Sequence, residues 1–284
     1  MPTYSQCIHQ ARKALREKGL PEETASVFMV ELTQLDRTDL YLHYDDEIPH
    51  EDYEKFTQGM ERILKDEPMQ YVLGFSWFYG YRFHVDENVL IPRPETEELV
   101  ANILIEMDEH FADKDQIYTV DIGTGSGAIA ISTALEEPRV KMIATDISEG
   151  AVQVAKGNAE ALGANIDFYV GDMLQPLIDR QIKVDFLICN PPYIPSEEVL
   201  ENSVKDYEPH VALFGGEDGL KFYRQVFEGA KQVLNDKAIM AFEIGYNQKE
   251  ALLEEVKKTF DDAEAEVLKD INGKNRMLIV RFIR

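Results

Sequence analysis

A buried strand that ends in an amide, two prolines and an aromatic ring has the clearest chemical content in this sequence. In FLICNPPYIP (186–195), four apolar residues lead into Asn190, Pro191, Pro192 and Tyr193. The side-chain carbonyl of Asn190 and the backbone carbonyl of Pro191 can each accept one N–H of a planar amino group, and the prolines fix the backbone that carries them. Tyr193 offers a face for stacking. The segment predicts a site for an amide or for the exocyclic amine of a nucleobase.

Such nitrogens are poor nucleophiles because their lone pair is delocalised. Two acceptors that hold both N–H bonds can turn the lone pair toward an electrophile, and a methyl group placed in line, about 3–3.5 Å away, completes a reactive geometry. This chemistry requires no covalent intermediate, metal or strong base, and the six histidines form no ligand pattern. Cys189 is most simply a small strand residue. We therefore predict direct transfer to nitrogen without a metal.

A glycine-rich corner predicts a cofactor site next to these residues. The corner lies in VDIGTGSGAIAI, where a strand turns into a helix, and contains Gly123, Thr124, Gly125, Ser126 and Gly127. Glycines there let the backbone approach a ligand closely, and the helix N-terminus offers unpaired amides. Asp146 ends the next strand, where a carboxylate can accept both hydroxyls of a ribose. NAD and S-adenosylmethionine fit these features equally well.

Three further side chains lie at strand ends that would border the same crevice. Asp121 precedes the glycines and can either orient the turn or touch the cofactor. Asp172 and Met173 follow the third strand, where they can bracket an adenine by a polar contact and by packing. The alternative for this pair is a solvent-facing acid beside a core methionine.

Alternating strand and helix patterns must position these motifs. Strands are expected at 117–123, 141–147, 166–172, 183–190 and 238–245, and helices at 127–137, 150–163 and 219–234. Such alternation favours a mainly parallel sheet with helices on both faces. The segments AEAEVLKDI (263–271) and RMLIVRFIR (276–284) add two strands, with a turn at Asn272-Gly273.

The first part of the chain has helical patterns with little strand signal. Helices are expected at 5–20, 22–35, 37–43 and 50–67; the first has a Ser5 cap and a Gly19 stop. We predict a small helical bundle over residues 1–72. Trp77, Tyr79, Tyr81 and Phe83 alternate around Gly80, which predicts a β-hairpin linker over residues 73–92.

Composition narrows the function classes. The net charge of −24 is spread along the chain without a long basic cluster, which argues against nucleic acid as a partner. No apolar run approaches the length of a membrane helix, and the N-terminal residues lack the apolar core of a secretory signal. Two cysteines suggest no disulfide framework. We expect a cytoplasmic protein without a membrane partner.

The combined motifs resemble the class I S-adenosylmethionine-dependent methyltransferases with an NPPY motif. A narrower resemblance covers almost the whole chain. YVLGFSWFYGYRFHVDENVLIPRPETEELV, DIGTGSGAIAI, NPPYIP and EPHVALFGGEDGLKFYRQ are together similar to the release factor glutamine methyltransferase family. This resemblance implies an α/β fold: a seven-stranded, Rossmann-like methyltransferase domain over residues 93–284, preceded by the small helical bundle and the hairpin linker.

The family resemblance also implies an activity. Methyl would pass from S-adenosylmethionine, leaving S-adenosylhomocysteine, to the side-chain amide nitrogen of the glutamine in the Gly-Gly-Gln motif of class I peptide chain release factors. The cofactor contacts fall on Gly123 to Gly127, Asp146, Met173 and Asn190, and the substrate contacts on Asn190 to Tyr193. Asn190, Pro191 and Tyr193 would be the catalytic residues. Met173 stands where a larger aromatic is common, which weakens its cofactor assignment.

The same resemblance assigns parts of the chain outside these motifs. Arg93, Glu95 and Glu97 of IPRPETE would frame the pocket. Apart from the resemblance, we predict that residues 1–72 recognise the substrate protein, because the NPPY segment can distinguish an amide and little else.

Three rival functions remain. An adenine-amino methyltransferase acting on DNA or RNA suits NPPY equally well, although the acidic charge argues against it. A binding module that has lost turnover would show damage to the glycines, Asp146 or NPPY, and none is damaged. An NAD oxidoreductase leaves NPPY without a role.

Overall fold

The structure, a computed structural model, describes residues 1–282, which divide into two units. The first unit consists of Met1–Phe75 together with Leu200–Tyr207, and the second of the described residues in 76–199 and 208–282. Residues 283 and 284, at the end of the expected strand RMLIVRFIR, lie outside the described residues.

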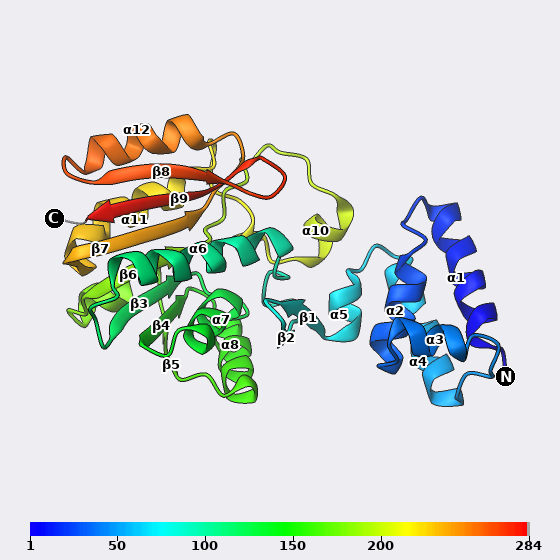
Figure 1. Ribbon diagram of the computed structural model, residues 1–284. Coiled ribbons are helices and arrows are strands. Elements are labelled where there is room, and N and C mark those ends of the chain that lie inside the picture. The colour runs from blue at the N-terminus through cyan, green and yellow to red at the C-terminus, as the bar shows by residue number, and fades with distance from the viewer. Residues whose placement is uncertain (283–284) are drawn as a thin grey trace. The chain divides into compact units, whose positions relative to one another are not determined.

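Helices build the first unit, and those of residues 4–73 share an apolar core (Figure 1). They are α1 (Tyr4–Lys18), α2 (Thr24–Thr33), α3 (Arg37–Leu42), α4 (His50–Ile63), α5 (Met69–Leu73) and α10 (Asn202–Tyr207). Ile8, Leu15 and Phe28 are among the fully buried side chains of this core. The helical character expected of the N-terminal region is confirmed; α5 and α10 are additions. α10 is tied to this unit by the Tyr207 hydroxyl, which donates to the Lys65 carbonyl at 2.8 Å.

The expected cap of the first helix is wrong by two residues. Thr3, not Ser5, is the N-cap of α1: its hydroxyl accepts from the Gln6 amide at 3.2 Å, and the Gln6 side chain accepts from the Thr3 amide at 3.0 Å. This reciprocal pair satisfies two amides that the helix leaves unpaired, which a cap at Ser5 would not do. Gly19 ends the helix as predicted, in the left-handed conformation with φ 73°.

The aromatic segment after α5 forms the predicted hairpin. β1 (Phe75–Phe78) and β2 (Tyr81–His84) make a two-stranded sheet. The turn residues Tyr79 and Gly80 both have positive φ, 51° and 79°, as a tight turn matched to the twist of the strands requires. The Glu97 carboxylate accepts from the Tyr79 amide at 2.8 Å and so holds this turn.

The second unit is built on a seven-stranded sheet. Its strands are β3 (Ile117–Ile122), β4 (Val140–Asp146), β5 (Ile166–Val170), β6 (Val184–Cys189), β7 (Leu234–Glu243), β8 (Glu264–Lys269) and β9 (Asn275–Phe282). Their order is β5-β4-β3-β6-β7-β9-β8. β5, β4, β3, β6 and β7 run parallel, and β9 is antiparallel to both of its neighbours. The mainly parallel sheet is confirmed.

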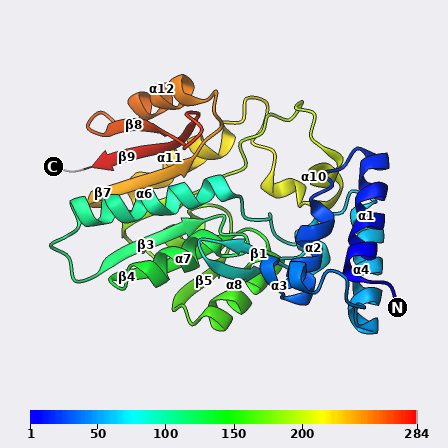
Figure 2. The same ribbon diagram turned by 45° about the vertical axis from the view of Figure 1, so that its right-hand side comes forward.

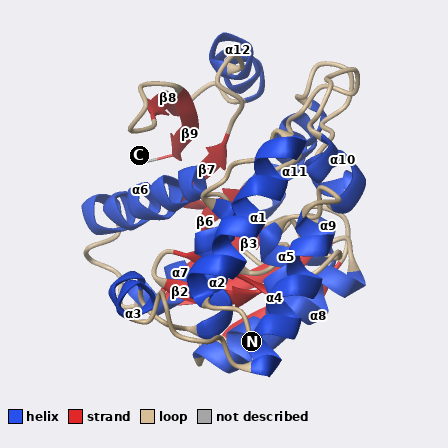
Figure 3. Ribbon diagram, turned by 90° about the vertical axis from the view of Figure 1, so that its right-hand side faces the viewer, coloured by secondary structure: helices blue, strands red, loops and turns tan. Residues whose placement is uncertain are grey.

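Helices cover both faces of this sheet, because the strands bury alternate side chains on each face. The helices are α6 (Pro94–His110), α7 (Ala128–Glu136), α8 (Glu149–Leu162), α9 (Gln175–Asp179), α11 (Lys221–Val233) and α12 (Lys249–Thr259), with a short 3-10 turn at His210–Ala212. On β6, Leu187 and Cys189 belong to one core while Phe186 and Ile188 belong to the other. Figure 3 shows α6 and α11 on opposite sides of β6 and β7, and Figure 2 shows α6 lying along the sheet.

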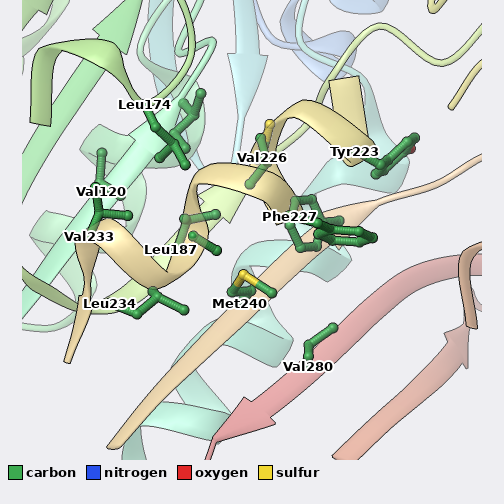
Figure 4. Packing of buried hydrophobic residues seen from close by; sticks show 14 of the residues in the cluster. Val120, Leu174, Leu187, Tyr223, Val226, Phe227, Val233, Leu234, Met240 and Val280 are labelled. Carbon is green, nitrogen blue, oxygen red and sulfur yellow. The ribbon is translucent and has the colours of Figure 1, made fainter. Parts of the chain in front are cut away.

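The side chains on one face of α11 are buried in a core against the sheet. Tyr223, Val226 and Phe227 of α11 belong to the same core as Leu187 of β6 and Met240 of β7 (Figure 4). All five side chains are fully buried or nearly so. Burying side chains of this size stabilises the fold by roughly 1.5–3 kcal/mol each relative to exposure.

Among residues 1–282, no helix is long and apolar enough to span a bilayer.

Candidate active site

The carboxyl ends of the parallel strands open onto a cleft of about 330 Å³ in the second unit. β3 lies between β4 and β6, so the connections leave β3 in opposite directions, and a crevice opens where they part. The predicted site residues that line the cleft are Gly123, Thr124, Gly125, Ser126, Asp146, Met173, Asn190, Pro191 and Pro192. Gly127 and Tyr193 are not among its lining residues.

The glycine-rich corner presents bare backbone to the cleft. Gly123 and Gly125 have φ of 70° and 56°, and an added Cβ at either position would meet nothing within 4 Å. The amides of Gly123 and Thr124 donate to the Thr145 carbonyl of β4 at 2.8 and 2.9 Å, which fixes the start of the corner. The open side of these glycines is therefore available for close approach by a ligand.

Gly127 has a packing role instead. It is the N-cap of α7 with φ 82°, and a Cβ there would lie 2.8 Å from Ile131 Cδ1 and 3.2 Å from Ala155 Cβ. A side chain here would be strained by the left-handed backbone and would press on Ala155 of α8. The corner is also held from α8 by Asn158, whose side-chain amide donates to the Ser126 carbonyl at 2.9 Å.

Asp146 holds the corner as well as facing the cleft. One carboxylate oxygen accepts from the Gly125 amide and the other from the Ser148 amide, both at 2.9 Å. Burial raises the pKa of Asp146, and the two amides oppose that rise. Each oxygen keeps a free acceptor position. The carboxylate can therefore receive further hydrogen bonds from a ligand while bracing the loop.

Asp121 lies behind the glycines, away from the cleft lining. It is fully buried, and one of its oxygens accepts from the Thr124 hydroxyl at 2.7 Å. The other oxygen has no hydrogen-bond partner among the described residues. Burial raises the pKa of Asp121 to about 7, and the Thr124 hydroxyl opposes the rise. The contact with Thr124 fits the role of orienting the turn, and Asp121 is not among the residues that line the cleft.

The residues after β5 form another part of the wall. Met173 adopts a positive φ of 44°, and its carbonyl accepts from the Thr145 hydroxyl at 3.4 Å. Asp172 is exposed in the cleft lining, and its carboxylate accepts from Gln225 of α11 at 3.0 Å. Both residues suggested by GDM therefore lie at the cleft.

The NPPY corner meets the cleft through its first three residues. Tyr193 is turned toward β7: its hydroxyl donates to Glu243 at 3.1 Å, and its ring packs against the core under α11. Burial raises the pKa of Tyr193 well above its usual range, and the Glu243 carboxylate adds to the rise.

The ALFGGEDGL segment braces this corner, which gives it a physical role that sequence reasoning did not assign. Ile194 forms a parallel bridge with Phe214, in which the Ile194 amide donates to the Leu213 carbonyl and the Gly215 amide donates back. A Cβ at Gly215 would lie 2.5 Å from the Pro192 carbonyl oxygen. Glycine is required here because two backbones touch.

Gln248 adds a second brace. Its side-chain amide donates to the carbonyls of Tyr193 and Gly219 at 3.1 and 3.2 Å, and its carbonyl accepts from the Gly245 amide at 2.8 Å. The NPPY backbone is thus held from two segments distant in sequence. No local pattern around Gln248 indicates this contact.

A buried hydrogen-bond chain connects Asn190 to the end of β7. The Asn190 side-chain amide donates to the Thr96 hydroxyl at 3.5 Å, and that hydroxyl donates to Glu243 at 2.5 Å. Glu243 is 2 % exposed. Sequence reasoning missed Thr96 and Glu243 because their partners lie 94 and 147 positions away.

The IPRPETE residues expected to frame the pocket take separate contacts. Arg93 lines the cleft and pairs with the buried carboxylate of Glu208 at 2.6 Å, which links IPRPETE to EPHVALFGGEDGL. Glu97 holds the hairpin turn. Glu95 is half-buried, and its charge raises the pKa of Glu243 after the larger effect of burial.

Comparison with known proteins agrees with this arrangement. Residues 6–74 match the family described as PrmC N-terminal domain, and residues 101–207 match the methyltransferase small domain. The release factor glutamine methyltransferase of Bacillus cereus is 42% identical over 279 residues, covering 98% of each chain. That of Staphylococcus aureus is 40% identical over 284 residues, covering 99% of this chain and 100% of the other. A methyltransferase structure from Pyrococcus furiosus, 19% identical, has the same fold with a TM-score of 0.52 over 80% of this chain and 98% of the other.

Proposed function

Since the chain belongs to the release factor glutamine methyltransferase family, we propose that it methylates the side-chain amide nitrogen of a glutamine in a release factor. The substrate is the glutamine of the Gly-Gly-Gln motif in class I peptide chain release factors, and the methyl donor is S-adenosylmethionine. The observation that carries this proposal is the position of Asn190, Pro191 and Pro192 in the same cleft as the glycine-rich corner.

The residues of the cleft fit the cofactor. Gly123 and Gly125 leave open space beside the backbone, and Asp146 keeps acceptor positions suited to ribose hydroxyls. Met173 adds an apolar surface at the end of β5. S-adenosylmethionine supplies a methyl group activated on a sulfonium when it is bound, and S-adenosylhomocysteine is the product.

The chain's own contribution is to orient the glutamine. Its amide nitrogen carries two N–H bonds, and we assign the Asn190 side-chain carbonyl and the Pro191 backbone carbonyl as their acceptors. Holding both bonds turns the lone pair toward the donor end of the cleft and reduces its delocalisation. Pro191 and Pro192 fix the backbone, and the braces from Gly215 and Gln248 support it. The role of Tyr193 is to hold its neighbours through Glu243.

Selection of one glutamine requires contacts beyond this pocket, because an amide-binding corner reads little else. We assign that selection to residues 1–72, with residues 73–92 as the linker and residues 93–284 as the methyltransferase domain. We also infer that nucleic acid is not a partner, because the net charge of −24 disfavours phosphate backbones, and that the protein is cytoplasmic, because its two cysteines suggest no disulfide framework.

A methyl-transfer assay with labelled cofactor tests the proposal. The acceptors are an intact class I release factor, the same factor with its Gly-Gly-Gln glutamine changed to alanine, duplex DNA and RNA. We expect label only on the intact factor. Label on a nucleic acid, with none on the factor, would favour the adenine-amino reading of NPPY.

A further inference from the structure

Thr96 lines the cleft beside Asn190, and Glu243 is buried next to Thr96. We propose that they are positioning residues: Glu243, acting through the Thr96 hydroxyl, orients the Asn190 side-chain amide so that its carbonyl faces the substrate. This inference rests on the proposed function, since it deepens the role of Asn190 in that site.

The Thr96 hydroxyl has a single proton to donate. That proton is engaged at 2.5 Å with one oxygen of Glu243, which as a carboxylate has no proton of its own. Thr96 can therefore only accept from its other neighbour, Asn190, whose side chain lies 3.5 Å away. An amide offers either a donor or an acceptor, and the Thr96 oxygen selects the donor end.

The consequence for Asn190 is a fixed orientation. Its NH2 group faces Thr96, so its Oδ1 is on the opposite side of the amide plane's axis, and both residues line the cleft, where that oxygen can meet a substrate. If the amide were reversed, its NH2 would meet the NH2 of the substrate glutamine, and two donors cannot bond to each other. A planar amide has no intrinsic preference between these two orientations, so the neighbours must decide it.

The direction of the hydrogen bonds from Asn190 through Thr96 to Glu243 depends on Glu243 being ionised. Its second oxygen accepts a hydrogen bond from the Tyr193 hydroxyl at 3.1 Å, so each carboxylate oxygen accepts one hydrogen bond from a hydroxyl group. Burial raises the pKa of Glu243, while Thr96, Arg276 and Tyr193 lower it and Glu95 raises it. Protonation of Glu243 would let it donate to Thr96, which could then donate to Asn190 and reverse the amide.

The matched pair Thr96→Val and Thr96→Ser separates this role from packing. Valine keeps the shape without the hydroxyl, and serine keeps the hydroxyl. With release factor as substrate, we expect kcat of Thr96→Val to fall by about 100-fold, the scale of a misplaced reacting group. KM and cofactor affinity should change little, and Thr96→Ser should recover most of kcat. Wild-type kcat in Thr96→Val would overturn the inference.

A spectroscopic measurement tests the orientation without relying on activity. In protein labelled with ¹⁵N-asparagine, the side-chain NH2 signals of Asn190 are identified as the pair missing in Asn190→Ala. We expect these protons to be protected from exchange in wild type and Thr96→Ser, and unprotected in Thr96→Val. Fast exchange in wild type would refute the orientation. Wild-type protein that fails to methylate the release factor while showing protected Asn190 protons would reject the proposed function and leave this inference standing.

Glu243→Gln provides the second variant, which also serves if Thr96→Val does not fold. The glutamine amide can donate to the Thr96 hydroxyl, which is then free to donate to Asn190 and to reverse its side chain. We therefore expect kcat to fall. In wild type, kcat should decline as the pH falls through the raised pKa of Glu243, because the protonated acid can donate to Thr96 and no longer fixes the direction of its hydroxyl. The variant should lack this decline. Identical pH profiles for the two proteins would count against Glu243.

Discussion

Gly219→Ala should disable the NPPY corner without any change in a residue that touches the reactants. Gly219 has φ +73°, and a Cβ added there would lie 2.3 Å from the Tyr193 carbonyl oxygen and 2.7 Å from the Gln248 amide nitrogen. Both atoms belong to the brace that holds the corner.

The size of the effect has two parts. The left-handed backbone costs a residue with a Cβ roughly 1–2 kcal/mol, which lowers stability. Relieving the clash requires the Tyr193 carbonyl to retreat by about 1 Å, and a displacement of that size can lower the rate about 100-fold. Asn190 and Pro191 are continuous with Tyr193, so we expect the loss mainly in kcat.

The assay is methylation of intact release factor at saturating cofactor, together with thermal unfolding. Gly157→Ala in α8 is the matched control, because its Cβ would meet nothing within 4 Å. Alanine is favoured over glycine inside a helix by roughly 1 kcal/mol, so the control should be as stable as wild type or more so, with unchanged activity. Gly219→Ala with wild-type kcat would show that the brace does not set the geometry of the corner.

Four further predictions address the cofactor, the substrate and pH. Asn190→Ala should lower kcat about 100-fold or more with a smaller change in KM, because it removes an acceptor that orients the nucleophile; a near-normal kcat would defeat this role. Asp146→Ala should weaken S-adenosylmethionine binding by about 1.5–3 kcal/mol, measured by calorimetry, since a charge-assisted contact is lost; unchanged affinity would remove Asp146 from the cofactor site. Asp121→Asn should change how unfolding by urea depends on pH. The folded pKa of Asp121 is about 7 against an ordinary 3.8, so between those values the folded state binds one more proton and wild-type stability falls as pH rises, by about 4 kcal/mol in total. The variant should lack that fall, and a fall of equal size in both proteins would contradict it. A chain lacking residues 1–73 should bind S-adenosylmethionine yet lose kcat/KM toward intact release factor, because selection of the substrate protein is assigned to that region; a soluble truncated chain with full kcat/KM would refute the assignment.

The main strands and the helices between them could be predicted because their patterns are local. Alternating strands and helices specified a mainly parallel sheet, which the structure has. The hairpin followed from alternating aromatics around Gly80. The cap at Thr3 could also have been found, because Gln6 stands three residues later, as a capping box requires.

Other parts of the fold were absent from the sequence interpretation for different reasons. α12 carries Leu252 and Val256 four positions apart, which is a helical signal present in the sequence itself. α5 and α10 are short, and α10 has no buried residue to mark a face. Such segments take their structure from neighbours rather than from their own pattern.

The parts of the site that escaped prediction depend on contacts between distant segments. Glu243 ends a strand, where an acid is ordinarily taken to face solvent, yet it is buried between Thr96 and Tyr193. Gly215 resembles a flexible loop residue but is needed for contact with the Pro192 carbonyl. Tyr193 was expected to offer a stacking face, and its hydroxyl contact became visible only once β7 was placed beside β6.

Mass spectrometry of a purified class I release factor tests the central claim most directly. The factor is incubated with the enzyme and S-adenosylmethionine, digested, and fragmented to locate the modification. We predict a gain of one methyl group on the side-chain nitrogen of the Gly-Gly-Gln glutamine, and no gain when Asn190→Ala replaces the wild-type enzyme. An unmodified glutamine after incubation with active, cofactor-binding wild-type enzyme, or a methyl group on another residue, would contradict the account.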